Sequence, residues 1–280
     1  MNDSRKSGDE QAALWNGASG HSWVEAQVLL DQMFLPFEEL LVDVAAAKPR
    51  TRVLDVGCGT GSTTLAVERR LGRESVCVGV DISEPMLEHA RDRAKRADSR
   101  AQFICADAEQ YAFEPSTFEL IVSRFGVMFF NDSVRAFENL RHASRKNGEL
   151  CVIAWRSVSE NSFMTAAENA VASFVPGLAA RDLDAPGQFH FADSKRVRQI
   201  LLDSGWSDVE IRPIDFECSF PETELVGHVT RFGPLGRALR EADAAMKARI
   251  FAEVRPAFAP YVHGDTVRFG AACWRIEARA

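Results

Sequence analysis

The chain has 280 residues, of which 46% are hydrophobic, and its formal net charge at pH 7 is −7. This length and composition allow one large hydrophobic core with additional elements. The negative charge argues against a nucleic-acid substrate, because phosphate binding requires a basic surface. No apolar run reaches the roughly 18 residues of a membrane-spanning helix, so we expect no integral membrane association.

The N-terminal region is predicted to lie outside the central fold. Residues 1–10 are polar, carry charges of both signs and lack the apolar stretch of a signal peptide, which predicts a disordered tail. An amphipathic helix is predicted at about 24–35, within the region 11–47, with Val24, Val28 and Leu35 on its apolar face. Because such a helix is not stable alone, we expect it to pack on the core and to close over the ligand site.

Residues 53–61 read Val-Leu-Asp-Val-Gly-Cys-Gly-Thr-Gly and carry the most informative pattern of the chain. The apolar, β-prone start predicts a buried strand. Three glycines at alternate positions then precede a helix-like stretch, which predicts a turn where bare backbone approaches a ligand. A dinucleotide site fits poorly, because Gly61 comes one residue early and Asp55 would repel a pyrophosphate.

At these residues the chain resembles the class I S-adenosylmethionine-dependent methyltransferases, whose first motif is an acid followed by Gly-x-Gly-x-Gly. Asp55, Gly57, Gly59 and Gly61 match that motif. The resemblance implies S-adenosyl-L-methionine as cofactor, S-adenosyl-L-homocysteine as product, and these four residues as part of the cofactor site. Residues 123–130 are similar to the ubiquinone/menaquinone-biosynthesis-like branch of the family, which methylates small molecules.

Two further acids follow predicted strands. Asp81 ends an apolar strand about 20 residues after the glycine loop, where it is placed to accept the ribose hydroxyls. Asp107 follows the next strand; in the family an acid here, with the N–H of Ala108, reads the adenine edge. The resemblance also implies that Ile82, Met86, Ser123 and Arg124 lie at the cofactor. The expected closure of residues 11–35 over the cofactor places Trp23 near its methionine end or the acceptor pocket.

The rest of the chain continues the alternation of strands and helices. We therefore expect an α/β fold: a doubly wound, seven-stranded, mostly parallel sheet with an antiparallel last strand and a helical lid. The expected organisation is an N-terminal helical lid at 11–47 and a methyltransferase domain at 48–280, with a helical insertion at 221–265. A loop rich in proline and glycine is expected at 176–187.

The six cysteines show no spacing typical of a metal site, so no metal is expected. Five of them lie in strand-like runs and should be small buried hydrophobes, while Cys58 lies in the glycine loop. Unpaired cysteines are typical of reduced thiols and predict a cytoplasmic protein.

Methyl transfer from a sulfonium needs mainly alignment and exclusion of water. A general base is needed only if the acceptor must lose a proton. His190, between two phenylalanines in the loop after the fifth strand, is the first candidate for this catalytic role, ahead of His21, His263 and Tyr261.

The sequence leaves open the acceptor, whether carbon, oxygen or nitrogen is methylated, and the oligomeric state. The expected partner is a small-molecule methyl acceptor. Two other functions remain as alternatives: a non-catalytic S-adenosylmethionine-binding protein and a nicotinamide-dependent dehydrogenase.

Overall fold

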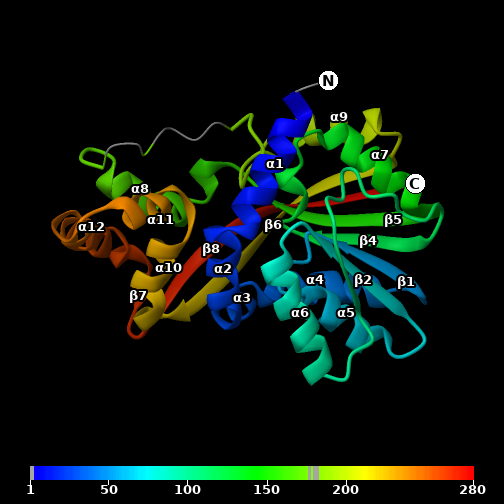
Figure 1. Ribbon diagram of the computed structural model, residues 1–280, viewed down its shortest axis with the longest axis horizontal. Coiled ribbons are helices and arrows are strands. Elements are labelled where there is room, and N and C mark those ends of the chain that lie inside the picture. The colour runs from blue at the N-terminus through cyan, green and yellow to red at the C-terminus, as the bar shows by residue number, and fades with distance from the viewer. Residues whose placement is uncertain (1–2, 176–177, 179–182) are drawn as a thin grey trace.

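A mixed sheet with helices on both faces forms the centre of the protein in the computed structural model, which describes residues 3–175, 178 and 183–280 (Figure 1). Within these residues the sheet has the strand order β3-β2-β1-β4-β5-β8-β6, and β7 pairs with β8. The strands are β1 (Arg52–Val56), β2 (Val76–Asp81), β3 (Gln102–Cys105), β4 (Phe118–Arg124), β5 (Ser144–Trp155), β6 (Ser207–Pro221), β7 (Val262–His263) and β8 (Thr266–Arg279).

Strands β1 to β5 are parallel to one another, whereas β8 runs antiparallel to both β5 and β6. The predicted fold class is therefore confirmed, with the two-residue β7 added to the seven expected strands. Helices cover both faces, so the central parallel strands can be apolar along their whole length. Val53, Leu54 and Val56 of β1 are accordingly all buried.

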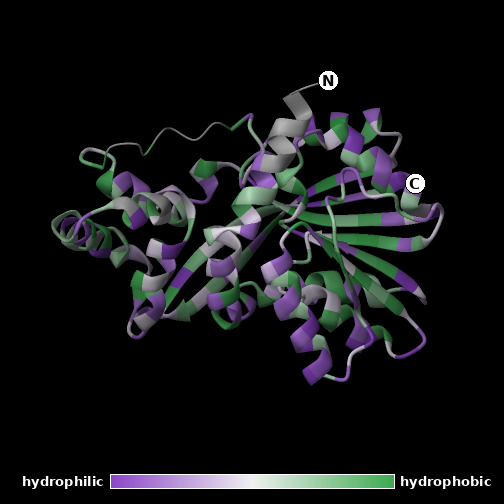
Figure 2. Ribbon diagram, viewed as in Figure 1, coloured by the Kyte–Doolittle hydropathy of each residue, from purple (hydrophilic) through white to green (hydrophobic). Residues whose placement is uncertain are grey.

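Figure 1 shows α4, α5 and α6 on one side of the sheet and α7 and α9 on the other. Asp132 caps α7 and accepts a hydrogen bond from the Arg135 N–H. Figure 2 shows the apolar strands between these mixed-polarity helices. The helices of the two layers are α4 (Leu35–Ala46), α5 (Ser62–Leu71), α6 (Glu84–Arg96), α7 (Ser133–Ala143) and α9 (Ser194–Asp203).

Strands β6 and β8 pair from Ser207–Arg279 to Pro221–Thr266 and extend beyond the central sheet. Figure 1 shows a second group of helices around their far ends. This group contains most of the expected helical insertion together with the helix after β5. Its helices are α8 (Phe163–Val171), α10 (Leu225–Arg231), α11 (Gly233–Glu241) and α12 (Ala244–Ala257).

The N-terminal region differs from expectation in where its helices begin and end. Instead of one helix through Val24, Val28 and Leu35, the chain bends at Ala26 and Phe34. Val28 is 63% exposed and Leu35 44% exposed, so the predicted apolar face was wrong. The helices before the sheet are α1 (Asp3–Asn16), α2 (Ala18–Glu25), α3 (Gln27–Met33) and α4.

The buried side chains follow a different stripe, which continues from α3 into α4: Leu30, Met33, Phe34, Phe37 and Leu41. This stripe has the helical spacing i, i+3, i+4, i+7, i+11, and it packs against the sheet. Part of the region expected as a lid, α4, is therefore a layer of the core.

Three smaller expectations also differ. Residues 3–10, expected as a disordered tail, lie in α1, whereas residues 1–2 lie outside the described residues. The loop expected at 176–187 lies partly outside them, because 176–177 and 179–182 are not described. Cys105 is exposed, since β3 is an edge strand, whereas the other five cysteines are buried.

Candidate functional site

A cavity of about 710 Å³ lies over the carboxyl ends of β1, β2 and β4. The strand order reverses between β1 and β4, and open α/β sheets bind ligands at such a point. The N-terminal helices contribute Trp15 and Trp23 to its wall, α10 contributes His228, and the junction of α10 and α11 contributes Phe232. The cavity thus lies between the sheet, the N-terminal helices and the insertion.

The glycine loop forms the floor of this cavity. Gly57, Gly59 and Gly61 all have positive φ, at 67°, 53° and 81°. A Cβ atom on Gly57 would lie 2.6 Å from the nearest neighbouring atom, and one on Gly61 would lie 2.9 Å away. On Gly59 the nearest atom would be Met86 Sδ at 3.7 Å. Packing therefore requires glycine at the outer two positions, whereas Gly59 borders open space.

Asp81 connects the end of β2 to the glycine loop. Its Oδ2 accepts from the Gly59 N–H at 2.8 Å, and its Oδ1 accepts from the Ser83 N–H at 2.9 Å. The side chain lines the cavity and is 8% exposed. Burial raises the pKa of Asp81, opposed by these backbone hydrogen bonds. A carboxylate held in this way can accept further hydrogen bonds from a ligand.

Three of the predicted cofactor residues do not line the cavity: Asp55, Gly61 and Ser123. Asp55 accepts a hydrogen bond of 2.6 Å from the Thr64 hydroxyl, and burial raises its pKa to about 7. The Ser123 hydroxyl donates to the Val56 carbonyl at 2.6 Å and accepts from the Gly126 N–H. Asp55 and Ser123 therefore pair with groups beside the glycine loop, and Gly61 lies against Ala90 and Phe103 instead of the cavity.

The other predicted cofactor residues line the cavity. Asp107 lies at the end of β3, and its Oδ1 accepts from the Glu109 N–H at 2.9 Å. The predicted residues that line the cavity are Trp23, Gly57, Gly59, Asp81, Ile82, Met86, Asp107, Ala108 and Arg124.

Arg124, at the end of β4, carries a buried guanidinium nitrogen with an unused donor. Its Nη1 has no hydrogen-bond partner among the described residues. The guanidinium lies 6.0 Å from the Phe34 ring centre. Its charge lowers the pKa of Asp55, but the larger effect of burial raises that pKa. An unpaired buried donor is costly, so this nitrogen favours a ligand that brings an anionic oxygen.

Hydrogen bonds connect the end of α1 to the turn after β2. The Asn16 side chain donates to the Ile82 carbonyl at 2.9 Å and accepts from the Glu84 N–H at 2.9 Å. The hydroxyl of Ser83, the residue before α6, donates to the Trp15 carbonyl at 2.6 Å. Sequence reasoning missed Asn16, because only its position against a distant turn distinguishes it.

A series of aromatic rings begins at Trp15 and extends along the wall of the cavity. Trp15 lies 5.1 Å from Phe129 and 6.2 Å from Trp23, measured between ring centres. Trp23 lies 5.9 Å from Phe232, which in turn lies 5.4 Å from His228. The N-terminal helices and the insertion therefore meet through edge contacts of aromatic rings.

His190 lines the cavity, but its ring contacts Arg196. The Arg196 guanidinium lies within hydrogen-bonding distance of both ring nitrogens, at 3.1 Å from Nε2. Burial and this cation lower the pKa of His190. This arrangement gives His190 a partner within the protein. His228, which sequence reasoning did not select, faces the same cavity from α10.

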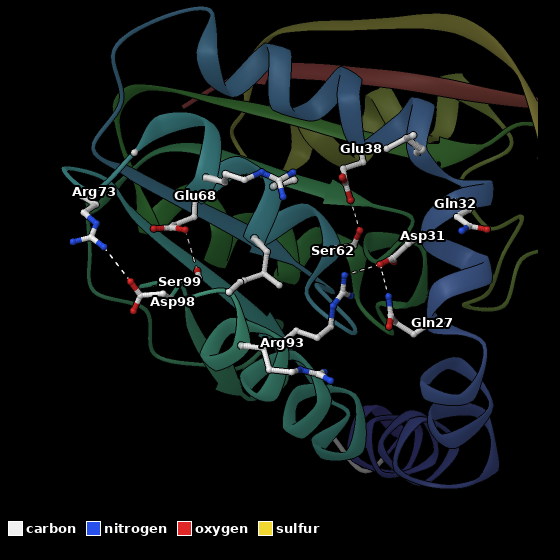
Figure 3. A pocket seen from close by; sticks show the side chains of 17 residues that line it. Gln27, Asp31, Gln32, Glu38, Ser62, Glu68, Arg73, Arg93, Asp98 and Ser99 are labelled. Atoms are coloured by element: carbon white, nitrogen blue, oxygen red, sulfur yellow. Dashed lines mark hydrogen bonds and ion pairs between the residues drawn. The ribbon is translucent and has the colours of Figure 1, made fainter.

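A second cavity, of about 760 Å³, lies between α3, α4, α5 and α6 and shares no lining residue with the first. Figure 3 shows that its polar side chains pair with one another, as Arg93 does with Asp31 at 2.6 Å and Ser99 with Glu68 at 3.0 Å. Such pairs leave few groups for a ligand. The first cavity is therefore the candidate site.

The described residues contain no group of three or more His, Cys, Asp and Glu side chains that could hold a metal ion. Over the same part of the chain, no helix is long and apolar enough to cross a membrane.

Comparisons with known proteins agree with this geometry. The profile of a methyltransferase domain family matches residues 53–148, which contain the glycine loop and both acids. The chain is 26% identical over 215 residues to the demethylmenaquinone methyltransferase of Renibacterium salmoninarum, covering 74% of this chain and 88% of that protein. Two other curated relatives are matched over 48% of their own length.

The chain is an S-adenosylmethionine-dependent methyltransferase. The predicted family, its quinone-biosynthesis-like branch and the cofactor are confirmed.

Two solved structures share the fold of this methyltransferase. The YcgJ protein of Bacillus subtilis has a TM-score of 0.54 at 17% identity, covering 86% of this chain and 97% of its own. Phosphoethanolamine N-methyltransferase 2 of Haemonchus contortus, solved with S-adenosyl-L-methionine, has a TM-score of 0.51 at 18% identity, covering 88% of this chain and 52% of its own.

The raised pKa of Asp55 predicts that the methyltransferase binds its cofactor more tightly as pH rises from 6 to 8. With a pKa of about 7, Asp55 is mostly protonated at pH 6 in the free protein. The cationic cofactor favours the ionised form, so binding releases a proton and gains up to about tenfold in affinity over this range. Calorimetry at pH 6, 7 and 8 measures the effect.

Asp55→Asn is the matched control for this pH dependence, because it retains an oxygen for Thr64 and does not titrate. The difference in pH dependence of cofactor affinity between the two proteins gives the contribution of Asp55. Titration of Asp81 and of the amino group of the cofactor contributes to both proteins alike. Equal pH dependence in both proteins would contradict the assignment to Asp55.

Proposed function

We propose that the methyltransferase transfers the methyl group to a small, largely apolar acceptor bound between the sheet edge and the insertion. The observation that carries this proposal is the continuity of the cavity: one space joins the glycine loop to apolar side chains of the insertion region. Phe163, Val229, Phe232 and Leu235 line its far side. A volume of about 710 Å³ is in the range of small-molecule sites.

The proposed cofactor contacts follow from the placement of the lining residues. Asp81 accepts hydrogen bonds from the ribose hydroxyls, and Asp107 with the Ala108 N–H holds the adenine. Gly59 leaves room for the methionine portion. Arg124 pairs its buried, unpartnered Nη1 with the methionine carboxylate.

When bound, S-adenosylmethionine supplies an electrophilic methyl group. The residues of the chain orient the acceptor toward that group and exclude water. Trp15, Trp23 and Phe232 suit the second task, because their rings form a nearly continuous apolar cover. The named activity of the Renibacterium relative, on demethylmenaquinone, supports an acceptor of small size.

Incubation of a metabolite extract with the protein and methyl-labelled S-adenosylmethionine tests this proposal. We expect mass spectrometry to find label in an apolar small molecule, and we expect no label with the Gly59→Val protein as control. Label found only in protein or nucleic acid would refute the proposal of a small-molecule acceptor.

We also propose a cytoplasmic location and no role in nucleic-acid binding. All six cysteines are free, as in proteins of reducing compartments. The net charge of −7 disfavours binding to a phosphate backbone.

A further inference from the structure

His228 lies among aromatic rings at the acceptor side of the cavity. It belongs to α10 in the insertion, is 9% exposed and lines the cavity. Its ring centre lies 5.1 Å from that of Phe220, 5.4 Å from Phe232 and 6.1 Å from Phe163. A histidine in such surroundings is desolvated, and any hydrogen bond it makes must come from the protein or from a ligand.

The described residues provide no partner for one nitrogen of this ring. His228 Nδ1 is buried and makes no hydrogen bond with them. Burial, aided by the Arg231 cation, lowers the pKa of His228 to about 4, so the ring is neutral at pH 7. A neutral imidazole has one donor nitrogen and one acceptor nitrogen. An unpaired nitrogen in an apolar cavity is costly, and a ligand group can remove that cost.

We propose that His228 binds the hydroxyl of a phenolic or enolic acceptor and receives its proton when that oxygen is methylated. This inference rests on the proposed function and names its acceptor class.

The surroundings of His228 favour a hydroxyl over the other acceptor groups. Arg231 and Arg240 line the same cavity and would repel an ammonium group. Glu168 of α8 also lines the cavity and carries the opposite charge. A carbon acceptor without a hydroxyl offers Nδ1 no hydrogen-bond donor in the bound complex. The aromatic surroundings suit a flat, apolar ring, and a phenol combines such a ring with an acidic hydroxyl.

The proposed step is balanced in atoms and electrons. The acceptor oxygen forms a bond to the methyl carbon while the bond from that carbon to sulfur breaks. The electron pair of the broken bond stays on sulfur, which becomes the neutral thioether of S-adenosylhomocysteine. The hydroxyl proton moves to the free nitrogen of His228 and leaves later to water. The hydroxyl becomes far more acidic as the new bond forms, so even this weakly basic imidazole can take its proton.

Binding of two matched probes tests the hydrogen bond without turnover. With saturating S-adenosylhomocysteine, we expect the wild-type protein to bind 1-naphthol about tenfold or more tightly than 1-methylnaphthalene, the cost of leaving Nδ1 unpaired. His228→Phe keeps an aromatic ring and should remove this preference. His142→Gln, on the exposed end of α7, is the control and should retain it.

The result overturns the inference if the wild-type protein binds the two probes equally, or binds neither. Affinity for S-adenosylhomocysteine, measured by calorimetry in every variant, separates the possible failures. Its loss in the wild-type protein would refute the proposed cofactor contacts, whereas its retention without a naphthol preference would refute only the role of His228. Retention in His228→Phe also shows that the variant is folded.

Turnover with the acceptor found by labelling tests the proton transfer. We expect the product to be a methyl ether and His228→Phe to lower kcat by at least tenfold near pH 7. Activity of this variant should recover as pH approaches about 10, where a phenol ionises without help. His228→Asn should bind the acceptor but remain slow. A product methylated on carbon or nitrogen, or a variant with unchanged kcat, would overturn the proposal.

Discussion

Gly59→Val is expected to abolish binding of S-adenosylmethionine while leaving the fold largely intact. Gly59 has φ of +53°, a conformation that a β-branched residue rarely adopts. Its side chain would enter the cavity beside Met86, where the nearest atom to a Cβ lies 3.7 Å away. The space lost is the space proposed for the methionine portion. Calorimetry measures the affinity, and circular dichroism with a thermal melt measures the fold.

Gly61→Val is the matched comparison for this prediction. A Cβ on Gly61 would lie 2.9 Å from Ala90 Cβ and 3.0 Å from the Phe103 ring. Because these contacts belong to the packing of α6 on the sheet, we expect this variant to lose stability as well as binding. Normal affinity in Gly59→Val, or a loss of its secondary structure, would contradict the assignment of Gly59 to ligand space.

Asp81→Ala is expected to weaken both S-adenosylmethionine and S-adenosylhomocysteine by about 1.5–3 kcal/mol, the value of hydrogen bonds to a charged acceptor. This corresponds to a loss of roughly ten- to 150-fold in affinity. Both ligands should be affected alike, since they share the ribose. Titration calorimetry with the two ligands provides the measurement.

Asp81 also accepts hydrogen bonds from Gly59 and Ser83, so the alanine variant loses support for the loop. Asp81→Asn retains an acceptor oxygen and should show a smaller loss. Unchanged affinity in the alanine variant would remove Asp81 from the ribose site. A loss for S-adenosylmethionine alone would point to its sulfonium charge instead.

The parts of the site that could be predicted from the sequence are those set by local patterns. Asp81 and Asp107 each follow a short apolar run, and parallel strands bring their carboxyl ends to one edge. Both acids therefore line the cavity as expected. Asp55 shows the limit of this reasoning. Its position at a strand end is correct, but its carboxylate accepts a hydrogen bond from Thr64 and does not line the cavity.

Features that depend on contacts between distant segments could not be predicted. The bend at Ala26 contains neither glycine nor proline, so the sequence gave no local sign of it, whereas Pro36 in the first turn of α4 does mark the bend at Phe34. Phe34 and Phe37 pack on Phe125 instead, which fixes the buried stripe. His228 acquires its surroundings only because Phe163 and Phe220 come from other elements.

The long pairing of β6 with β8 has a consequence for how such an enzyme can diverge. Pro221 pairs with Thr266, and the Glu222 N–H donates to the Asp265 carbonyl at 2.8 Å, so the two ends of the insertion are neighbours. Changes in the length or sequence of the chain between them need not alter the strand register. Descendants of one ancestral protein could therefore acquire new acceptors through this segment alone, while inheriting the glycine loop and its acids unchanged.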